Sequence, residues 1–179
     1  MITNAQQKWL DHLPDDDQVA ILPFDPTAQA KFEVVQKKIQ AVLGDNIPVL
    51  HRGATSLGIS GQDEIDVYVP VPTDHFDKFI KPLTVTFGNP RSHYPHERAR
   101  FVTEVDGKHI DIFLVSETHQ SWLDGVKFDA LLRSNPEALL RYRLLKEANA
   151  GLSTREYYRR KTEFFNEILA LINQESEAI

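Results

Sequence analysis

The stretch from residue 52 to residue 71 constrains the fold more than any other part of the chain, because a loop that carries glycine leads there into an alternating strand. The loop runs from Gly53 to Ser56, and the strand begins with Glu64 and Asp66. Successive side chains of a strand point to opposite faces, so these two carboxylates share a face. Paired carboxylates hold divalent cations, and glycine lets backbone N–H groups approach a phosphate. The stretch therefore predicts a metal and phosphate site, against the alternative of a solvated strand entrance.

A later strand supplies a third carboxylate. Residues 99–105 and 109–115 alternate on either side of Asp106-Gly107, a pair of residues that strongly favours a hairpin turn. In the second arm, His109 and Asp111 share one face, opposite the apolar residues. An unpaired carboxylate within an apolar strand is costly, so Asp111 is expected to have a partner. We predict that it joins Glu64 and Asp66; an edge-strand aspartate that faces water is the alternative.

Apolar spacing and turn residues predict the remaining elements. One helix is expected over 6–13, a second begins at the N-cap Thr27 and ends at Gly44, and a third covers 73–81 and ends at Pro82. Strands are expected over 49–51, 65–71 and 83–87. After His119 the spacing is helical, with one helix starting at Asn135-Pro136 and a capping box at Ser153 to Glu156 starting the last. We expect three parts: a peripheral segment 1–18, an α/β core 19–118, and a helical part 119–179 packed on that core as one structural unit.

Composition narrows the class of function. A hydrophobic content of 41% and a charged content of 26% in 179 residues are typical of a soluble globular protein. The chain has no cysteine, which excludes disulfides, thiolate metal sites and thiol nucleophiles. No secretory signal or membrane-spanning apolar stretch is present, so we expect a cytoplasmic protein without a membrane partner. The net charge of −6 argues against general nucleic-acid binding.

Basic residues nevertheless gather in the last third of the chain. Residues 137–165 hold seven Lys or Arg against four Glu. On the predicted helices, Tyr142 and Lys146 are four residues apart, and Tyr158 and Lys161 are three apart, so each pair shares a helix face. A solvated helix face is the alternative for each of these residues.

The loop and the strand together resemble the nucleotidyltransferase superfamily, which has the polymerase-beta-like fold. In that pattern a Gly followed by Gly or Ser precedes acid, apolar, acid, apolar; here the parts are Gly53-Ala54 and residues 64–67. The run from His51 to Thr55 is similar to the His-x-Gly-Ser-Thr loop of the GrpB family, and the likeness extends from about Val19 to Leu171. The chain departs from the pattern at Ala54, which lacks the serine hydroxyl, and it has an acid-x-acid pair where many GrpB members keep a single aspartate.

This resemblance implies an α+β fold, a small mixed β-sheet of the nucleotidyltransferase fold with flanking helices and a C-terminal helical part. It also implies a metal-dependent transfer of a nucleoside monophosphate from a nucleoside triphosphate to an unknown acceptor hydroxyl. The implied metal ligands and catalytic residues, for Mg²⁺ or Mn²⁺, are Glu64, Asp66 and Asp111. The residues implied to contact the nucleotide are Gly53, Ala54, Thr55 and Ser56 in the loop, and Tyr142, Lys146, Tyr158 and Lys161 on the helices.

Two other classes of function stay open. A non-catalytic module that binds a nucleotide or phosphometabolite on the same fold is consistent with Ala54. A weaker alternative is an interaction protein whose acidic sheet and basic helices pair with a partner. The sequence has neither a Gly-x-Ser-x-Gly elbow nor a P-loop, and Pro95 separates His93 from His96, so acyl transfer, P-loop chemistry and a histidine metal site have little support.

Overall fold

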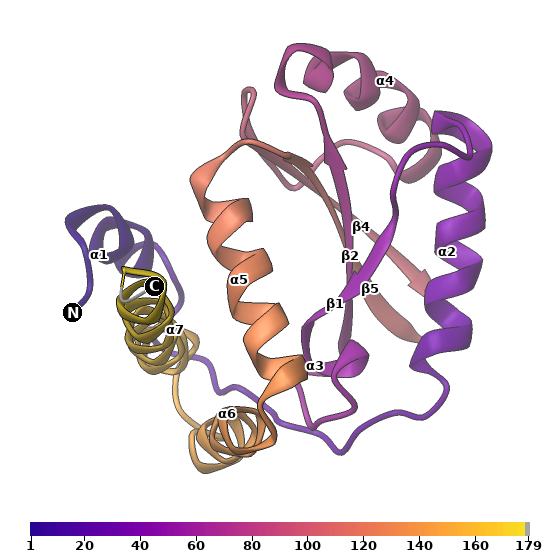
Figure 1. The fold of residues 1–179 in the computed structure, drawn as a ribbon. Helices are drawn as coiled ribbons and strands as arrows, with labels where there is room; N and C mark the ends of the chain where they lie inside the picture. Colours follow the sequence, from indigo (N-terminus) through magenta and orange to yellow (C-terminus); the bar gives the residue numbers. More distant parts are fainter. Residues whose placement is uncertain (178–179) are drawn as a thin grey trace. The chain divides into compact units, whose positions relative to one another are not determined.

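A five-stranded mixed sheet, in the order β1-β2-β5-β4-β3, is built from the alternating segments of the chain (Figure 1). The strands are β1 (Leu50–Arg52), β2 (Glu64–Val71), β3 (Ser92–Tyr94), β4 (Arg98–Val105) and β5 (Lys108–Ser116). β2 and β5 are parallel, and the other neighbouring pairs are antiparallel. Side chains alternate between the two faces of the sheet along each long strand. Ile65, Val67, Ile110 and Ile112 are fully buried on the apolar face, and the acidic residues of β2 and β5 lie on the other face.

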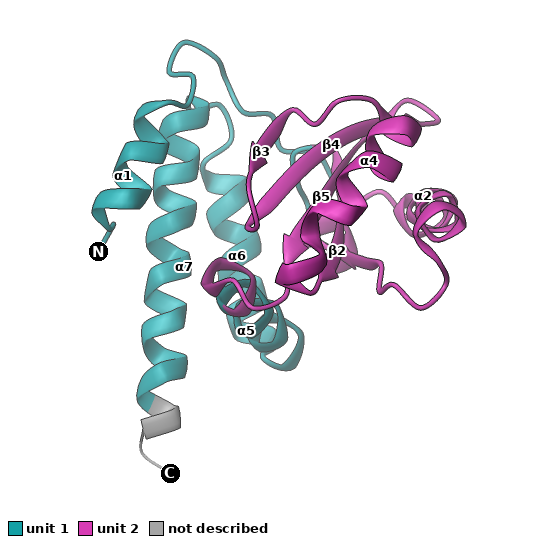
Figure 2. Ribbon diagram, turned by 90° about the horizontal axis from the view of Figure 1, so that it is seen from above, with its two compact units in different colours: residues 1–23, 60–62, 124–179 teal, residues 24–59, 63–123 magenta. Residues whose placement is uncertain are grey.

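The computed structural model describes residues 1–177, with side chains through residue 174, and it divides into two compact units (Figure 2). The sheet unit consists of Phe24–Ile59 and Asp63–Leu123. The helical unit consists of Met1–Pro23, Ser60–Gln62 and the chain from Asp124 onward. The expected α+β class, a small mixed sheet with flanking helices and a C-terminal helical part, is confirmed.

Two helices of the sheet unit, α2 (Ala28–Leu43) and α4 (Phe76–Phe87), pack on the apolar face of the sheet (Figure 1). The predicted stop at Pro82 and the predicted strand over 83–87 are wrong, because α4 continues through the proline. Leu83 is fully buried and Phe87 packs against the same core. Burying such a side chain contributes roughly 1.5–3 kcal/mol, so the two together offset the cost of about 3 kcal/mol for an interior proline.

Local signals placed the other boundaries well. Asp106 and Gly107, with φ values of 49° and 74°, form the turn between β4 and β5, as the hairpin prediction requires; positive φ at both residues is typical of a type I′ turn. Asn135 accepts a hydrogen bond from the N–H of Ala138 at the start of α6 (Pro136–Ala148). At the start of α2, Thr27 is the N-cap residue as expected, but its side chain makes no cap hydrogen bond; its backbone N–H and hydroxyl both donate to Asp25 instead.

The helical unit joins stretches that are far apart in sequence. It contains α1 (Asn4–Asp11), most of α5 (Gln120–Ser134), α6 and α7 (Thr154–Glu177); the sheet unit also holds α3 (Gly53–Ser56) and a 3₁₀ turn (Thr73–His75). The N–H of Val19 donates to the carbonyl of Leu152, and Leu22 pairs with Gly61. Within residues 1–177 no helix has the length and apolarity that crossing a membrane requires.

Candidate functional site in the sheet unit

Asp66 and Asp111 are direct neighbours on the polar face of the sheet. They are opposite each other in the register of the parallel strands β2 and β5, which lie about 4.8 Å apart. Glu64 lies two residues upstream of Asp66 on the same face, opposite His109. The strand pairing therefore brings the three predicted carboxylates onto one face, with the two aspartates closest in register.

Asp111 has the partners that a buried carboxylate needs. It is only 4% exposed, and β5 is an interior strand, so the alternative of an edge aspartate facing water is wrong. Arg100 Nη1 on β4 lies 3.5 Å from Asp111 Oδ2, and His109 Nε2 lies 3.2 Å from Oδ1. The Arg100 side chain is 41% exposed, so its guanidinium contacts both solvent and this buried carboxylate.

The position of the Asp66 carboxylate leaves no room for a side chain at Gly53, the first residue of α3. Its φ of +72° lies in the left-handed region, where side chains are strained. A Cβ at this position would lie 2.0 Å from Asp66 Oδ2 and 2.9 Å from its Cγ. The glycine thus gives room to a carboxylate of the chain itself, which is a different reason from the close approach of a phosphate that the sequence suggested.

The hydroxyls of the glycine loop already have partners within the chain. Ser56 Oγ donates to the carbonyl of Gly53 at 3.0 Å, and Thr55 Oγ1 lies 2.9 Å from His51 Nε2. His51 also contacts Gln29 Oε1 through Nδ1 and stacks on the ring of Phe32. These contacts fix the loop against α2, but they leave Thr55 and Ser56 less available to replace the missing hydroxyl at position 54.

The carboxylates fit a divalent cation as a pair. In the described part of the chain, no three histidine or acidic side chains converge as a preformed metal site. Mg²⁺ commonly uses one or two protein carboxylates, with water and substrate phosphates completing the octahedron. Asp66 and Asp111 match that donor set, and the assignment of Glu64 as a third ligand stays a prediction.

Arginine and aromatic residues that the sequence analysis missed lie beside Asp66. Arg52, at the end of β1, is opposite Asp66 in the register, and its guanidinium carbon lies 4.8 Å from the ring centre of Trp122 and 5.4 Å from that of Tyr68. The Tyr68 ring stacks on both Trp122 and Phe113. The alternation of β2 and β5 placed Tyr68 and Phe113 on the acidic face, and that pattern was the one available signal for them.

A buried lysine holds the loop that precedes the acidic strand. Lys108 is 5% exposed, and its amine pairs with Asp63 and lies 3.6 Å from Asp25. Asp63 has a φ of 65°, in the left-handed region, and it lies in the bend just before Glu64. The ion pairs tie this turn to the start of β5 and to the segment leading into α2.

The four predicted residues of the helices form their pairs within the helical unit. The Lys146 amine lies 5.5 Å from the ring centre of Tyr142, and the Lys161 amine lies 5.0 Å from that of Tyr158. Lys146 is only 4% exposed, and the Tyr158 hydroxyl donates to Gln62. The contacts of these residues with a nucleotide stay a prediction.

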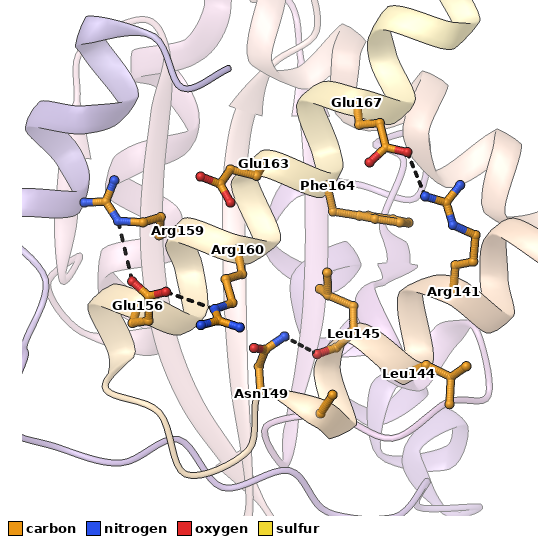
Figure 3. Close-up of a pocket in the computed structure, with 11 residues that line it drawn as sticks. Arg141, Leu144, Leu145, Asn149, Glu156, Arg159, Arg160, Glu163, Phe164 and Glu167 are labelled. Carbon is orange, nitrogen blue, oxygen red and sulfur yellow. Dashed lines mark hydrogen bonds and ion pairs between the residues drawn. The ribbon is translucent and has the colours of Figure 1, made fainter.

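A groove of about 780 Å³ lies between α6 and α7 (Figure 3). Its floor is apolar, with Leu145 and Phe164, and its rim carries the ion pairs Arg141–Glu167 and Arg160–Glu156. None of the sequence-predicted site residues lines it. Because its charges are largely balanced by their neighbours on the rim, this groove has no feature selective for a strongly anionic ligand.

The chain belongs to the GrpB family, whose profile, described as GrpB protein, matches residues 18–171. The resemblance found in the sequence is thereby confirmed, with nearly the same boundaries. Among solved structures, it is similar to the conserved protein GrpB from Enterococcus faecalis, at 18% identity and a TM-score of 0.63, over 87% of this chain and 95% of that one.

Weaker similarity extends to two structures of the Cid1 poly(U) polymerase, one with Mg and 3′-dATP bound. The identities are 12% and 13%, and the TM-scores are 0.41 and 0.42. The matches cover 72% and 75% of this chain but 44% and 48% of the polymerase chains. This chain thus spans less than half of that enzyme, and likeness of this degree carries no argument about activity. A comparison of this chain with curated proteins found no match.

Proposed function

We propose that the protein is a metal-dependent nucleotidyltransferase that moves a nucleoside monophosphate from a nucleoside triphosphate to the hydroxyl of an acceptor. One observation carries the proposal: Asp66 and Asp111 are opposite each other on parallel strands, with the glycine loop packed against the Asp66 carboxylate. Membership of the GrpB family supports it, because the loop and acid-x-acid pattern of this chain resemble the nucleotidyltransferase pattern.

In this proposal Asp66 and Asp111 hold Mg²⁺ or Mn²⁺, with Glu64 as the third predicted carboxylate. The ion, when bound, supplies charge neutralisation at the phosphates and a lowered pKa at the acceptor hydroxyl. The acceptor oxygen forms a bond to the α-phosphorus, the bond from that phosphorus to the β-phosphate oxygen breaks, pyrophosphate leaves, and the hydroxyl proton passes to solvent. Arg100 and His109 orient Asp111 for this role.

In this proposal two groups of residues bind the phosphates of the nucleotide. Gly53, Ala54, Thr55 and Ser56 form the loop beside the carboxylates. Tyr142, Lys146, Tyr158 and Lys161 supply cations and rings from the helical unit. A charge-assisted hydrogen bond contributes roughly 1.5–3 kcal/mol, so replacing Lys161 by Gln is expected to weaken triphosphate binding more than monophosphate binding.

A non-catalytic module that binds a nucleotide or phosphometabolite is the second candidate. The observation that favours it is the state of the loop: Ala54 has no hydroxyl, and those of Thr55 and Ser56 contact His51 and Gly53. A loop occupied in this way is compatible with binding without the phosphate positioning that transfer needs.

Thermal unfolding and pyrophosphate release together test both candidates. A ligand that binds the folded state raises the unfolding temperature, so each nucleoside triphosphate is added with and without Mg²⁺, using a small-molecule cell fraction as the source of acceptor. A transferase shows Mg²⁺-dependent stabilisation and releases pyrophosphate. A binding module shows the stabilisation without the release. If neither response is observed, both candidates are contradicted. Asp66→Asn and Asp111→Asn should abolish the stabilisation, and Glu104→Gln, an exposed acid on β4, should not.

A further inference from the structure

The sheet unit carries its own cation next to the paired aspartates. Arg52 is the last residue of β1, directly before Gly53, and it is opposite Asp66 in the antiparallel register of β1 and β2. Residues opposite each other in such a pair project from the same face. The guanidinium of Arg52 therefore lies on the face that carries Asp66 and Asp111.

Aromatic rings hold this guanidinium in one place. Its carbon lies 4.8 Å from the ring centre of Trp122 and 5.4 Å from that of Tyr68, and these rings are stacked with 5.7 Å between their centres. Phe113 continues the stack on β5, 4.8 Å from Tyr68. A guanidinium over aromatic faces is attracted by their electron-rich surfaces, and its planar fork of five N–H donors matches the geometry of phosphate oxygens.

The charges of this face favour an anionic ligand once the carboxylates are neutralised. Arg52 is opposite Asp66, and Arg100 contacts Asp111, so each aspartate has an arginine beside it. A divalent cation held by the two aspartates would neutralise their charge, which leaves the two arginines as positive groups beside them; Glu64, on the same face, offsets one of these. Planar guanidinium groups match phosphate oxygens in geometry and charge.

We propose that Arg52 binds the phosphate groups of the nucleotide and that Trp122 and Tyr68 are positioning residues that hold its guanidinium beside the two aspartates. This inference rests on the proposed function, and it differs from the assignment of the phosphate-binding cations to the helical unit alone. Its ligand is a triphosphate with its divalent cation, either free or as part of a nucleotide.

Calorimetric binding of Mg²⁺ with tripolyphosphate, and of Mg²⁺ with a non-hydrolysable nucleoside triphosphate, tests the inference and separates the two ligand sources. Arg52→Gln is expected to weaken binding of both by roughly ten-fold to a hundred-fold, and Arg52→Lys by less, because lysine keeps the charge but loses the planar fork. Arg91→Gln, at an exposed arginine of the same unit, is the matched control and should bind as the wild type does.

A double-mutant cycle tests the positioning role of the ring. Trp122→Leu should weaken binding, and Trp122→Leu with Arg52→Gln should be no weaker than Arg52→Gln alone, because the ring acts through the arginine. In a Trp9→Phe background, Trp122 is the one remaining tryptophan, so tripolyphosphate with Mg²⁺ should change its fluorescence in the parent but not in Arg52→Gln. A purely structural role for Arg52 would leave this signal intact.

The outcomes separate this inference from the proposed function. If Arg52→Gln and Arg52→Lys, folded by circular dichroism, bind both ligands as the wild type does while Asp66→Asn does not, the inference is wrong and the proposed function stands. If the wild type binds neither ligand, both are overturned. Loss of binding in Arg52→Gln and in Asp66→Asn, with Arg91→Gln unchanged, supports both.

Discussion

The carboxylate of Asp66 fills the space that a side chain at position 53 would need, since a Cβ on Gly53 would lie 2.0 Å from Asp66 Oδ2. The two residues belong to different elements, the start of α3 and the middle of β2. Glycine at position 53 is therefore coupled to the presence and orientation of a site carboxylate. A side chain at position 53 requires the Asp66 carboxylate to move, whereas a smaller residue at position 66 leaves the glycine in place.

Gly53→Ala is expected to lower the free energy of unfolding by more than Gly58→Ala, measured by urea denaturation. Both glycines have nearly the same positive φ, +72° and +70°, so both variants carry the left-handed strain of about 1–2 kcal/mol. A Cβ at Gly58 meets no atom within 4 Å, whereas one at Gly53 displaces Asp66. Equal losses in the two variants would show that the Asp66 contact imposes no constraint.

Removing the Asp66 side chain should remove the excess cost at position 53. In an Asp66→Ala background, Gly53→Ala is expected to cost about as much as Gly58→Ala, the left-handed strain of about 1–2 kcal/mol. The same denaturation measurement gives the coupling energy. An unchanged cost would place the cause of the glycine elsewhere in the loop.

Ala54→Ser is expected to leave Mg²⁺-dependent nucleotide binding equal or tighter, because it restores the hydroxyl of the family pattern. Position 54 is half-buried in α3, and a change of this size should shift stability by no more than about 0.5 kcal/mol. Titration calorimetry compares the variant with the parent. A clear weakening would mean that the loop is misaligned with that pattern.

Asp25→Asn should destabilise the protein at pH 7 by about 1 kcal/mol, because a neutral acceptor replaces a charged one and hydrogen bonds to charged groups are the stronger. The hydroxyl of Thr27, its backbone N–H and then Lys31 hold the pKa of Asp25 well below its usual value. A lowered folded pKa stabilises the fold above the unfolded value of about 3.9. The difference between parent and variant should therefore shrink as pH falls below about 4.

Denaturant unfolding at a series of pH values measures that difference. Asp45→Asn, at an exposed aspartate just beyond the other end of α2, is the control and should show no comparable loss at pH 7. A difference between parent and Asp25→Asn that stays constant from pH 7 to pH 3 would argue against a stabilising role of the Asp25 charge.

Lys108→Met is expected to lower the free energy of unfolding by about 1–3 kcal/mol, because the charged hydrogen bond to Asp63 and the ion pair with Asp25 are lost. The partly exposed carboxylates stay hydrated, which limits the cost. Adding Asp63→Asn should cost less in Lys108→Met than in the parent. Lys78→Met, at an exposed position of α4, is the control; additive effects of Lys108→Met and Asp63→Asn would contradict the coupling.

Features set by neighbouring residues were predictable from the sequence, and features set by tertiary contacts were not. The Asp106-Gly107 turn and the Asn135 cap are local, and both were placed correctly. Pro82 was interpreted as a helix stop, but the burial of Leu83 against the sheet outweighs the local signal. Local propensity yields to core packing in such segments.

The same distinction applies to the candidate site. Alternation alone indicated that Asp66 and Asp111 lie on polar faces, but the register that makes them neighbours needs the folded sheet. The contact of Arg52 with Trp122 joins positions 70 residues apart, and no spacing rule connects them. The ion pair of Lys108 with Asp63 likewise depends on how β5 meets the turn before β2.

The short stretch Ser60–Gln62 belongs to the helical unit although it lies between β1 and β2 of the sheet. Ser60 donates to Glu147, Gly61 pairs with Leu22, and Gln62 accepts from Tyr158. Cleavage after residue 123 would keep the sheet's carboxylates but strip this stretch of its partners at 147 and 158. An engineered exchange of the helical unit would therefore have to replace three separate stretches of the chain at once.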